Sequence, residues 1–201
     1  MSAQAQPRLS PEEYLELDRA AEFRHEYFDG RMYMMAGGSH VHAIIIPNLA
    51  RELGNALKKR PCVVSTSDAR VLASEGGLYT YPDLAVVCGE PIYAGSKRDI
   101  LVNPTLIIEV LSPSTEAYDR GFKFAQYRKL ESLQEYVLVS QSEPRVEAFR
   151  RQPSADWLLS EYSGMDATCR FLSIDCTAAL AEIYDKVTFA PEETGHPSPS
   201  V

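Results

Sequence analysis

Residues 104–115 read PTLIIEVLSPST, an aliphatic run that contains one carboxylate, Glu109, and ends in a polar turn. Successive side chains on a strand point to opposite faces, so Ile107 and Leu111 would share a face with Glu109. A run that is apolar on both faces is typical of a strand covered on both sides. An unpaired charge is costly there, so the sequence predicts a buried strand whose glutamate has a partner.

A second carboxylate, Asp83, opens the DLAVV run directly after Pro82, which restricts the preceding residue to an extended conformation. If this run is a strand beside the one that contains Glu109, the two carboxylates can meet on one face. Like charges repel strongly at low dielectric, so the pair would need a cation, a shared proton or a basic partner. A divalent metal bound through oxygen atoms meets that need. In the alternative reading, Asp83 belongs to a turn or strand edge and Glu109 pairs with an arginine.

The next helical pattern, DRGFKFAQYRKL over residues 119–130, supplies a basic candidate. Spacings of three, four and seven place Lys123 on one helix face with Gln126, Tyr127 and Leu130. Because Tyr127 and Leu130 should face inward, Lys123 would point toward the sheet. There its ammonium could orient an attacking water and stabilise developing charge. An exposed lysine on a basic helix is the alternative.

The remaining patterns alternate between helices and strands. Ser10-Pro11-Glu12-Glu13 is a capping box and predicts a helix from Pro11 to about Arg19. Asp29-Gly30 between aromatic-rich runs predicts a hairpin. We further expect a helix capped by Ser39 with an irregularity at Pro47, a strand over 62–73, a turn at Gly76-Gly77, a loop over 88–104, a hairpin over 135–151, strands at 157–163 and 169–175, and a helix capped by Thr177 that runs to Tyr184. This order favours a mixed sheet flanked by helices.

The composition bounds the protein class. With 201 residues, 45% of them hydrophobic, we expect one domain over 9–189 between disordered segments 1–8 and 190–201. No run approaches a membrane span and the N-terminus lacks an apolar signal core, so we expect a soluble, cytoplasmic protein. Four cysteines without a Cys-x-x-Cys pair predict reduced thiols rather than a zinc ribbon or disulfide framework.

The net charge of −8 is unusual for a protein that binds nucleic acid through many phosphate contacts, because such proteins usually have a basic surface. Basic residues do cluster locally, at 58–60 and along 120–129. Each cluster could also be an ordinary solvated helix face.

Four segments, YPDLAVV, LIIEVLSPST, DRGFKFAQYRK and EYVLVSQSEPRVEAFRR, resemble the Uma-type restriction-endonuclease family of the PD-(D/E)XK nuclease superfamily. The resemblance runs from about Leu9 to Phe189. It implies an α/β restriction-endonuclease-like core with an N-terminal helix and hairpin, in which Asp83 and Glu109 bind Mg²⁺ or Mn²⁺. The superfamily's usual lysine, two residues after the glutamate, is replaced here by Leu111. In the Uma type it lies on the following helix, where Lys123 is the matching position.

Two further positions, Glu26 and His40, match the family pattern, and Tyr127 is a separate candidate. Glu26, on the first hairpin strand, would be a third metal ligand; an exposed strand carboxylate is the alternative. His40, at a helix start, could hold a phosphate together with free backbone N–H groups, or be a surface histidine. Tyr127 is the second candidate for substrate binding. No role is assigned to the remaining histidines, which show no ligand spacing: His25, His42 and His196.

The leading hypothesis is a metal-dependent endonuclease that hydrolyses phosphodiester bonds in DNA, with Asp83, Glu109 and Lys123 as catalytic residues. The acidic charge and the lysine missing at position 111 motivate an alternative, a catalytically inactive nuclease fold that binds nucleic acid or regulates a partner. A two-carboxylate glycosidase is a third hypothesis, although its aromatic platform would rest on a single tryptophan, Trp157. The resemblance also implies a homodimer, with the strand-rich hairpins as candidate interfaces.

Overall fold

The computed structural model describes residues 8–35, 37–74 and 77–189. The predicted disordered segments therefore lie outside the described residues, except for Arg8. The predicted Gly76-Gly77 turn is described only at Gly77. Within these ranges no helix is long and apolar enough to cross a membrane.

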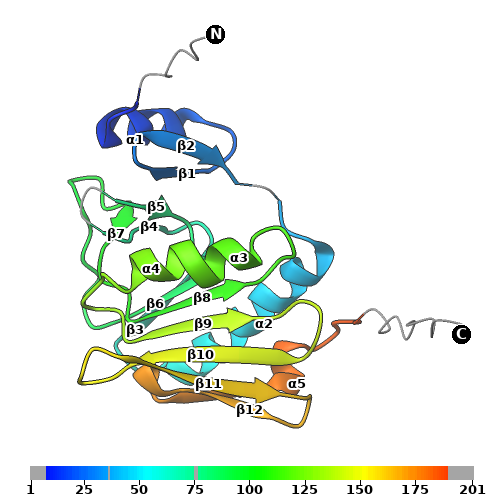
Figure 1. Cartoon of the computed structure of the whole chain (residues 1–201). Coiled ribbons are helices and arrows are strands. Elements are labelled where there is room, and N and C mark those ends of the chain that lie inside the picture. Colours follow the sequence, from blue (N-terminus) through cyan, green and yellow to red (C-terminus); the bar gives the residue numbers. More distant parts are fainter. Residues whose placement is uncertain (1–7, 36, 75–76, 190–201) are drawn as a thin grey trace, which may run out of the picture.

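The larger sheet has the strand order β11-β10-β9-β8-β6-β3. Its strands are β3 (Cys62–Thr66), β6 (Leu84–Cys88), β8 (Leu106–Val110), β9 (Glu135–Val139), β10 (Arg145–Arg151) and β11 (Trp157–Ser163). β8 runs parallel to β9 and antiparallel to β6, so the sheet is mixed. Helices lie on both of its sides, as the sequence predicted (Figure 1).

The β8 strand is covered on both faces, and all five of its residues are buried. Ile108 and Val110 pack in the core formed with α2 (His40–Leu57), whereas Ile107 packs with Tyr127 in the core on the opposite face. Glu109 alternates with Ile108 and Val110, so it belongs to the face that carries Tyr127. The prediction of a buried strand around this glutamate is confirmed.

A second sheet, of order β2-β1-β5-β4-β7, carries the N-terminal elements. Its strands are β1 (His25–Phe28), β2 (Arg31–Met34), β4 (Arg70–Leu72), β5 (Tyr79–Thr80) and β7 (Ile100–Leu101). The predicted hairpin turn is confirmed, with φ of 47° at Asp29 and 79° at Gly30, the left-handed conformation that a type I′ turn requires. Here β1 also pairs with β5, which connects the hairpin to the rest of the chain.

Both predicted N-terminal helices are present. Helix α1 (Pro11–Ala20) begins with the complete capping box, in which Ser10 and Glu13 cap each other's backbone N–H groups. Helix α2 is capped by Ser39 and continues through Pro47, so the predicted irregularity does not end it. The helical segment after β8 differs from the prediction, because it consists of α3 (Glu116–Tyr118), a π-helical turn (Asp119–Lys123) and α4 (Phe124–Tyr127).

Other differences arise where tertiary pairing overrides a local pattern. The single strand expected over 62–73 is two strands in different sheets, because a turn closed by the Ala69 N–H on the Thr66 carbonyl separates them. The expected loop over 88–104 contains β7, which pairs in parallel with β4. Thr177 does not cap a helix but lies within β13 (Cys176–Ala179), which pairs with β12 (Thr168–Phe171). The last helix, α5 (Leu180–Ile183), is correspondingly shorter, and a 3₁₀ turn (Leu172–Ile174) follows β12.

The prediction of four reduced thiols is also wrong for two cysteines. Antiparallel pairing of β3 with β6 places Cys62 opposite Cys88, and their sulfur atoms form a disulfide. The other two, Cys169 and Cys176, are free and buried. The bonded pair is 26 residues apart, and the strand register that brings it together has no signature in the cysteine spacing.

Candidate active site

Strand pairing places Asp83 beside Glu109. Because Leu84 lies opposite Ile108, the residue that precedes β6 meets the glutamate on β8. The Asp83 backbone N–H donates a hydrogen bond to Glu109 Oε2 at 3.3 Å. The Val110 N–H donates to Asp83 Oδ2 at 2.7 Å. The predicted meeting of the two carboxylates is therefore found, at the end of β6 where its pairing with β8 begins.

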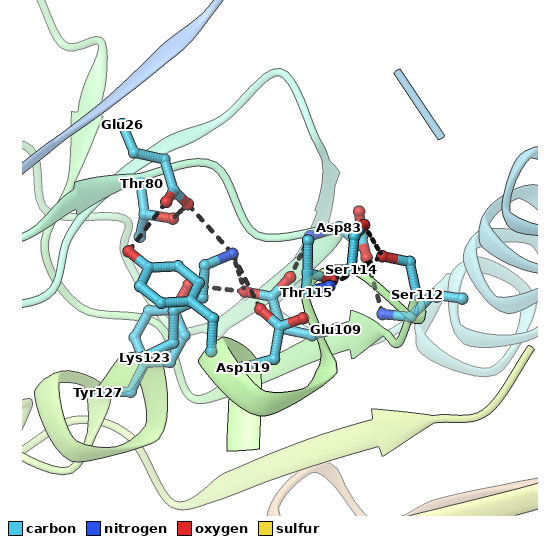
Figure 2. Close-up of polar contacts among 12 residues, drawn as sticks. Glu26, Thr80, Asp83, Glu109, Ser112, Ser114, Thr115, Asp119, Lys123 and Tyr127 are labelled. Atoms are coloured by element: carbon cyan, nitrogen blue, oxygen red, sulfur yellow. Dashed lines mark hydrogen bonds and ion pairs between the residues drawn. The ribbon is translucent and has the colours of Figure 1, made fainter. Parts of the chain in front are cut away.

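Lys123 approaches the same carboxylates from the helical segment. Its Nζ lies 3.1 Å from Glu26 Oε1, 3.2 Å from Glu109 Oε1 and 3.3 Å from Asp119 Oδ1. The lysine side chain is only 8% exposed, so the predicted inward orientation is confirmed. Figure 2 shows its ammonium among these three carboxylates.

The backbone that carries Lys123 is the π-helical turn. Its wider turn is shown by the Phe124 N–H, which donates to the carbonyl of Asp119, five residues back. Single π turns within α-helices are uncommon and frequently occur at functional sites. Both Asp119 and Lys123 are buried in this turn. Asp119 was not predicted as a site residue, although its spacing of four from Lys123 could have identified it.

Glu26 joins the cluster from β1 of the other sheet. The Thr80 hydroxyl on β5 donates to its carboxylate, and the Tyr118 hydroxyl on α3 donates to Oε2 at 3.1 Å. The Lys123 ammonium contacts Oε1 of both Glu26 and Glu109, and so connects the two sheets. The exposed-carboxylate alternative for Glu26 does not hold, because only 9% of its side chain is exposed.

Tyr127 lies behind the glutamate. Its hydroxyl donates to Glu109 Oε1 at 2.9 Å, and the residue has no exposed surface. Burial raises the pKa of Tyr127 well above its usual value, so the hydroxyl stays protonated and remains a donor. In this structure Tyr127 therefore contacts Glu109 and is not open to an incoming substrate.

Asp83 has a further partner that the sequence analysis passed over. His42, in the first turn of α2, places Nε2 3.1 Å from Asp83 Oδ2. The Ser39 hydroxyl accepts the His42 backbone N–H at 3.1 Å and so caps this turn. His40, predicted to contact phosphate, is exposed at the start of the same helix. The capping serine places His42 in the first helical turn, but no pattern in the sequence identifies Asp83 as its partner.

The chain is similar to known proteins over most of its length. The family model described as "Uma2: Putative restriction endonuclease" matches residues 11–180. The chain belongs to this family. Two Synechocystis proteins are similar to this Uma2 chain: "Uncharacterized protein slr1290" is 38% identical over 91% of the chain and 95% of its own length. "Uncharacterized protein sll1609" is 35% identical over 81% of the chain and 92% of its own length.

A solved structure shares the fold of the Uma2 chain. It is "a putative nuclease belonging to DUF820 from Anabaena variabilis", with a TM-score of 0.71 and 20% identity over 88% of this chain and 97% of that chain. At this identity the likeness shows the fold alone. It confirms the predicted α/β class, and family and fold together indicate a restriction-endonuclease-like nuclease.

The Uma2 site concentrates negative charge. The carboxylates of Glu26, Glu109 and Asp119 contact the single ammonium of Lys123, and Asp83 borders Glu109. Burial raises the pKa of Glu109 to about 8, and repulsion from Asp119 and Asp83 adds to this effect while Lys123 opposes it. Burial likewise raises the pKa of Asp119. Burial alone would lower the pKa of Lys123, but its carboxylate neighbours raise it well above the usual value. The lysine is therefore charged, whereas a pKa of about 8 leaves much of Glu109 protonated at neutral pH.

The donor set suits a hard divalent cation. Mg²⁺ prefers oxygen ligands and usually takes one or two carboxylates while keeping several waters. Asp83 and Glu109 provide such a pair, and a cation beside them would offset their mutual repulsion. In the part of the chain that the structure describes, no group of three or more His, Cys, Asp or Glu side chains is arranged to hold a metal. Glu26 therefore contacts Lys123 here without completing a three-residue metal group.

Proposed function

We propose that this protein is a metal-dependent endonuclease that hydrolyses phosphodiester bonds in DNA, with Asp83 and Glu109 as ligands of Mg²⁺ or Mn²⁺. The observation that carries the proposal is the buried contact of Lys123 with Glu109, beside Asp83. When bound, the ion would lower the pKa of a water and neutralise charge on the phosphate. His42 and the Val110 N–H engage Asp83 Oδ2, so we assign Asp83 Oδ1 to the ion.

Lys123 is the catalytic cation in this proposal. Its ammonium would donate a hydrogen bond to the attacking water and stabilise the negative charge that develops on the phosphate oxygens. A buried, preorganised donor is more effective than a solvated one because water does not screen it. The raised pKa of Lys123 keeps the side chain charged, which suits a donor rather than a general base.

Two contacts position the charged groups. Tyr127 donates to Glu109 Oε1, which leaves Oε2 directed toward Asp83. Glu26 and Asp119 hold the Lys123 ammonium from two other sides. We therefore assign Tyr127, Glu26 and Asp119 as positioning residues. Glu26 would become a further metal ligand only by giving up its contact with Lys123 when the ion binds.

The test is cleavage of duplex and single-stranded DNA of many sequences by the purified protein, with Mg²⁺ or Mn²⁺ and with EDTA. We expect cleavage that either ion supports and EDTA abolishes. Intact DNA under every metal condition would overturn the proposal. DNA cleavage that persists in EDTA would overturn the metal dependence, and hydrolysis of oligosaccharides in EDTA would instead favour the two-carboxylate glycosidase chemistry.

A catalytically inactive nuclease fold is the second candidate. The net charge of −8 and the presence of Leu111 at the usual lysine position favour it. Calorimetry distinguishes the two, because an inactive binder would retain DNA affinity without binding Mg²⁺ or Mn²⁺.

Size-exclusion chromatography with light scattering tests the expected homodimer, and the location of a tagged chain in cells tests the expected cytoplasmic localisation.

A further inference from the structure

A pocket of about 460 Å³ opens beside the candidate site. Glu26 forms one part of its wall, and the other lining residues are all aromatic: Phe28, Tyr33, Tyr118 and Phe122. Because Glu26 also contacts Lys123, the pocket and the acidic cluster share a wall.

The aromatic wall is preorganised. Tyr118 and Phe122 stack with ring centroids 5.3 Å apart and planes 15° from parallel. Phe28 meets Phe122 edge-on, with centroids 4.7 Å apart. Tyr33, on β2, also lines the pocket and is 48% exposed. These rings offer apolar faces to a flat ligand, with one ring still free to pack against it.

The pocket also has a polar component. Glu26 Oε2 accepts from the Tyr118 hydroxyl at 3.1 Å, and Glu26 Oε1 accepts from the Thr80 hydroxyl and contacts Lys123. A carboxylate has more acceptor positions than these contacts use, so it can also accept an N–H from a ligand. A flat aromatic molecule with N–H donors at its edge would match both the rings and the carboxylate.

We infer that this pocket holds an unpaired nucleobase of the DNA strand that is cut at the Asp83–Glu109 site. The inference rests on the proposed nuclease function and adds a substrate class to it, single-stranded or locally unpaired DNA. A base inside a duplex is stacked on its neighbours and has to leave the helix to enter such a pocket. Stacking on aromatic side chains is tolerant of sequence because every base has a π-face. A protein of net charge −8 gains affinity in this way without many phosphate contacts.

A second copy of the chain is a less suitable occupant. Apolar side chains from a partner would bury Glu26 further without offering a new donor, which is unfavourable for a carboxylate. A nucleobase offers ring or amino N–H groups to the same oxygen atoms.

The probe is a single-stranded oligonucleotide with one 2-aminopurine, whose fluorescence falls when the base stacks. Ca²⁺ replaces Mg²⁺, and a gel confirms that the strand is intact. We expect quenching on binding and an affinity about tenfold higher for the single strand than for its duplex. Tyr33→Ala should weaken single-strand binding about tenfold and remove part of the quenching. The matched control is Phe23→Ala, which removes an aromatic side chain that is 59% exposed and lies outside the pocket.

A second variant, Phe122→Leu, keeps an apolar side chain and removes the stacked ring, and circular dichroism verifies its fold. We expect it to lose quenching as well. Three results would each overturn base binding in the pocket, whether or not the protein cuts DNA. The first is 2-aminopurine fluorescence that does not fall on binding, and the second is the absence of any DNA binding. The third is equal affinity for single-stranded and duplex DNA that Tyr33→Ala does not change. Quenching that depends on Tyr33, without cleavage by the parent under Mg²⁺, would overturn the nuclease and support the pocket. If Tyr33→Ala dissociates a dimer and leaves DNA affinity unchanged, the pocket binds a second copy of the chain and not a nucleobase.

Discussion

The Lys123 ammonium lies 3.2 Å from Glu109 Oε1, although the lysine belongs to a π-helical turn and the glutamate to the buried strand β8. The contact explains how a carboxylate is tolerated within LIIEVL, because the lysine and Tyr127 both donate to it. It also places a charged donor beside Glu109 from a helical segment rather than from the strand that carries the glutamate.

Replacing this lysine should separate catalysis from folding. We expect Lys123→Met to reduce cleavage in Mg²⁺ about 100- to 1,000-fold, the loss typical of a preorganised donor. The variant should also be less stable, by about 3–5 kcal/mol, because the buried carboxylates lose their cation. Plasmid nicking and urea unfolding measure the two effects. Lys129→Met, at an exposed lysine of the same segment, is the control. Parental activity in Lys123→Met would remove the proposed catalytic role.

Asp83→Asn tests the metal pair. With Mg²⁺ or Mn²⁺, the parent should gain thermal stability, whereas the variant should gain little because the ion loses a charged ligand. Without metal, the variant should melt no lower than the parent, since the change removes repulsion that raises the pKa of Glu109. Glu90→Gln, at an exposed position, controls for net charge. An undiminished metal-dependent shift in Asp83→Asn would show that the ion binds elsewhere.

Tyr127→Phe should change the pH dependence of cleavage. The Tyr127 hydroxyl lowers the pKa of Glu109 by donating to the carboxylate, so its removal should raise that pKa. If the charged glutamate is the active form, the rising limb of the pH–rate profile should move to higher pH. Loss of the buried hydrogen bond to a charged group should cost about 1.5–3 kcal/mol of unfolding free energy. Tyr93→Phe, outside the acidic cluster, should leave the profile in place. An unchanged profile in Tyr127→Phe would refute the assigned role.

Acid stability should depend on a second buried ion pair, between Asp18 and Arg70, whose closest atoms are 2.6 Å apart. Burial alone would raise the pKa of Asp18, but hydrogen bonds from Tyr81 and Arg70 together lower it. A lowered folded-state pKa stabilises the protein above the unfolded value near pH 4, and this contribution is lost as pH falls through the folded value. Asp18→Asn should therefore cost about 3–5 kcal/mol at pH 7 and progressively less below pH 4, measured by urea unfolding. A cost independent of pH would contradict the ionic origin.

Thiol titration tests the disulfide. In denaturant without reductant, we expect two reactive thiols, those of Cys169 and Cys176. Four thiols appear after reduction. The Cys62–Cys88 crosslink should contribute about 2–4 kcal/mol of stability, seen as an earlier urea midpoint in reduced protein. Four thiols before reduction would show that this pair is not bonded in the purified protein.

Local chemistry in the sequence determined much of the secondary structure. The capping box at Ser10, the Asp29-Gly30 turn and the doubly apolar run around Glu109 each act through neighbouring residues, so their structures are predictable from short segments. Strand and helix patterns also predicted roles for Asp83 and Lys123, and the resemblance to the family implied the same two residues. The expected proximity of both residues to Glu109 is confirmed. Strand pairing brings Asp83 to Glu109, and the helical segment brings Lys123 to it.

Contacts between distant segments were decided by tertiary structure. The register of β3 with β6 brings Cys62 to Cys88, and the first turn of α2 brings His42 to Asp83. Neither contact has a local pattern, because register and helix orientation depend on how whole faces pack. The lysine contact with Glu26 likewise requires the second sheet to lie against the helical segment. By itself, the sequence determined the buried strand and the carboxylates near it. The partners of Glu109 and Lys123 were decided only when both sheets and the helical segment packed together. The physical reason is that a buried charge is costly unless it is paired, and the paired groups here come from different elements.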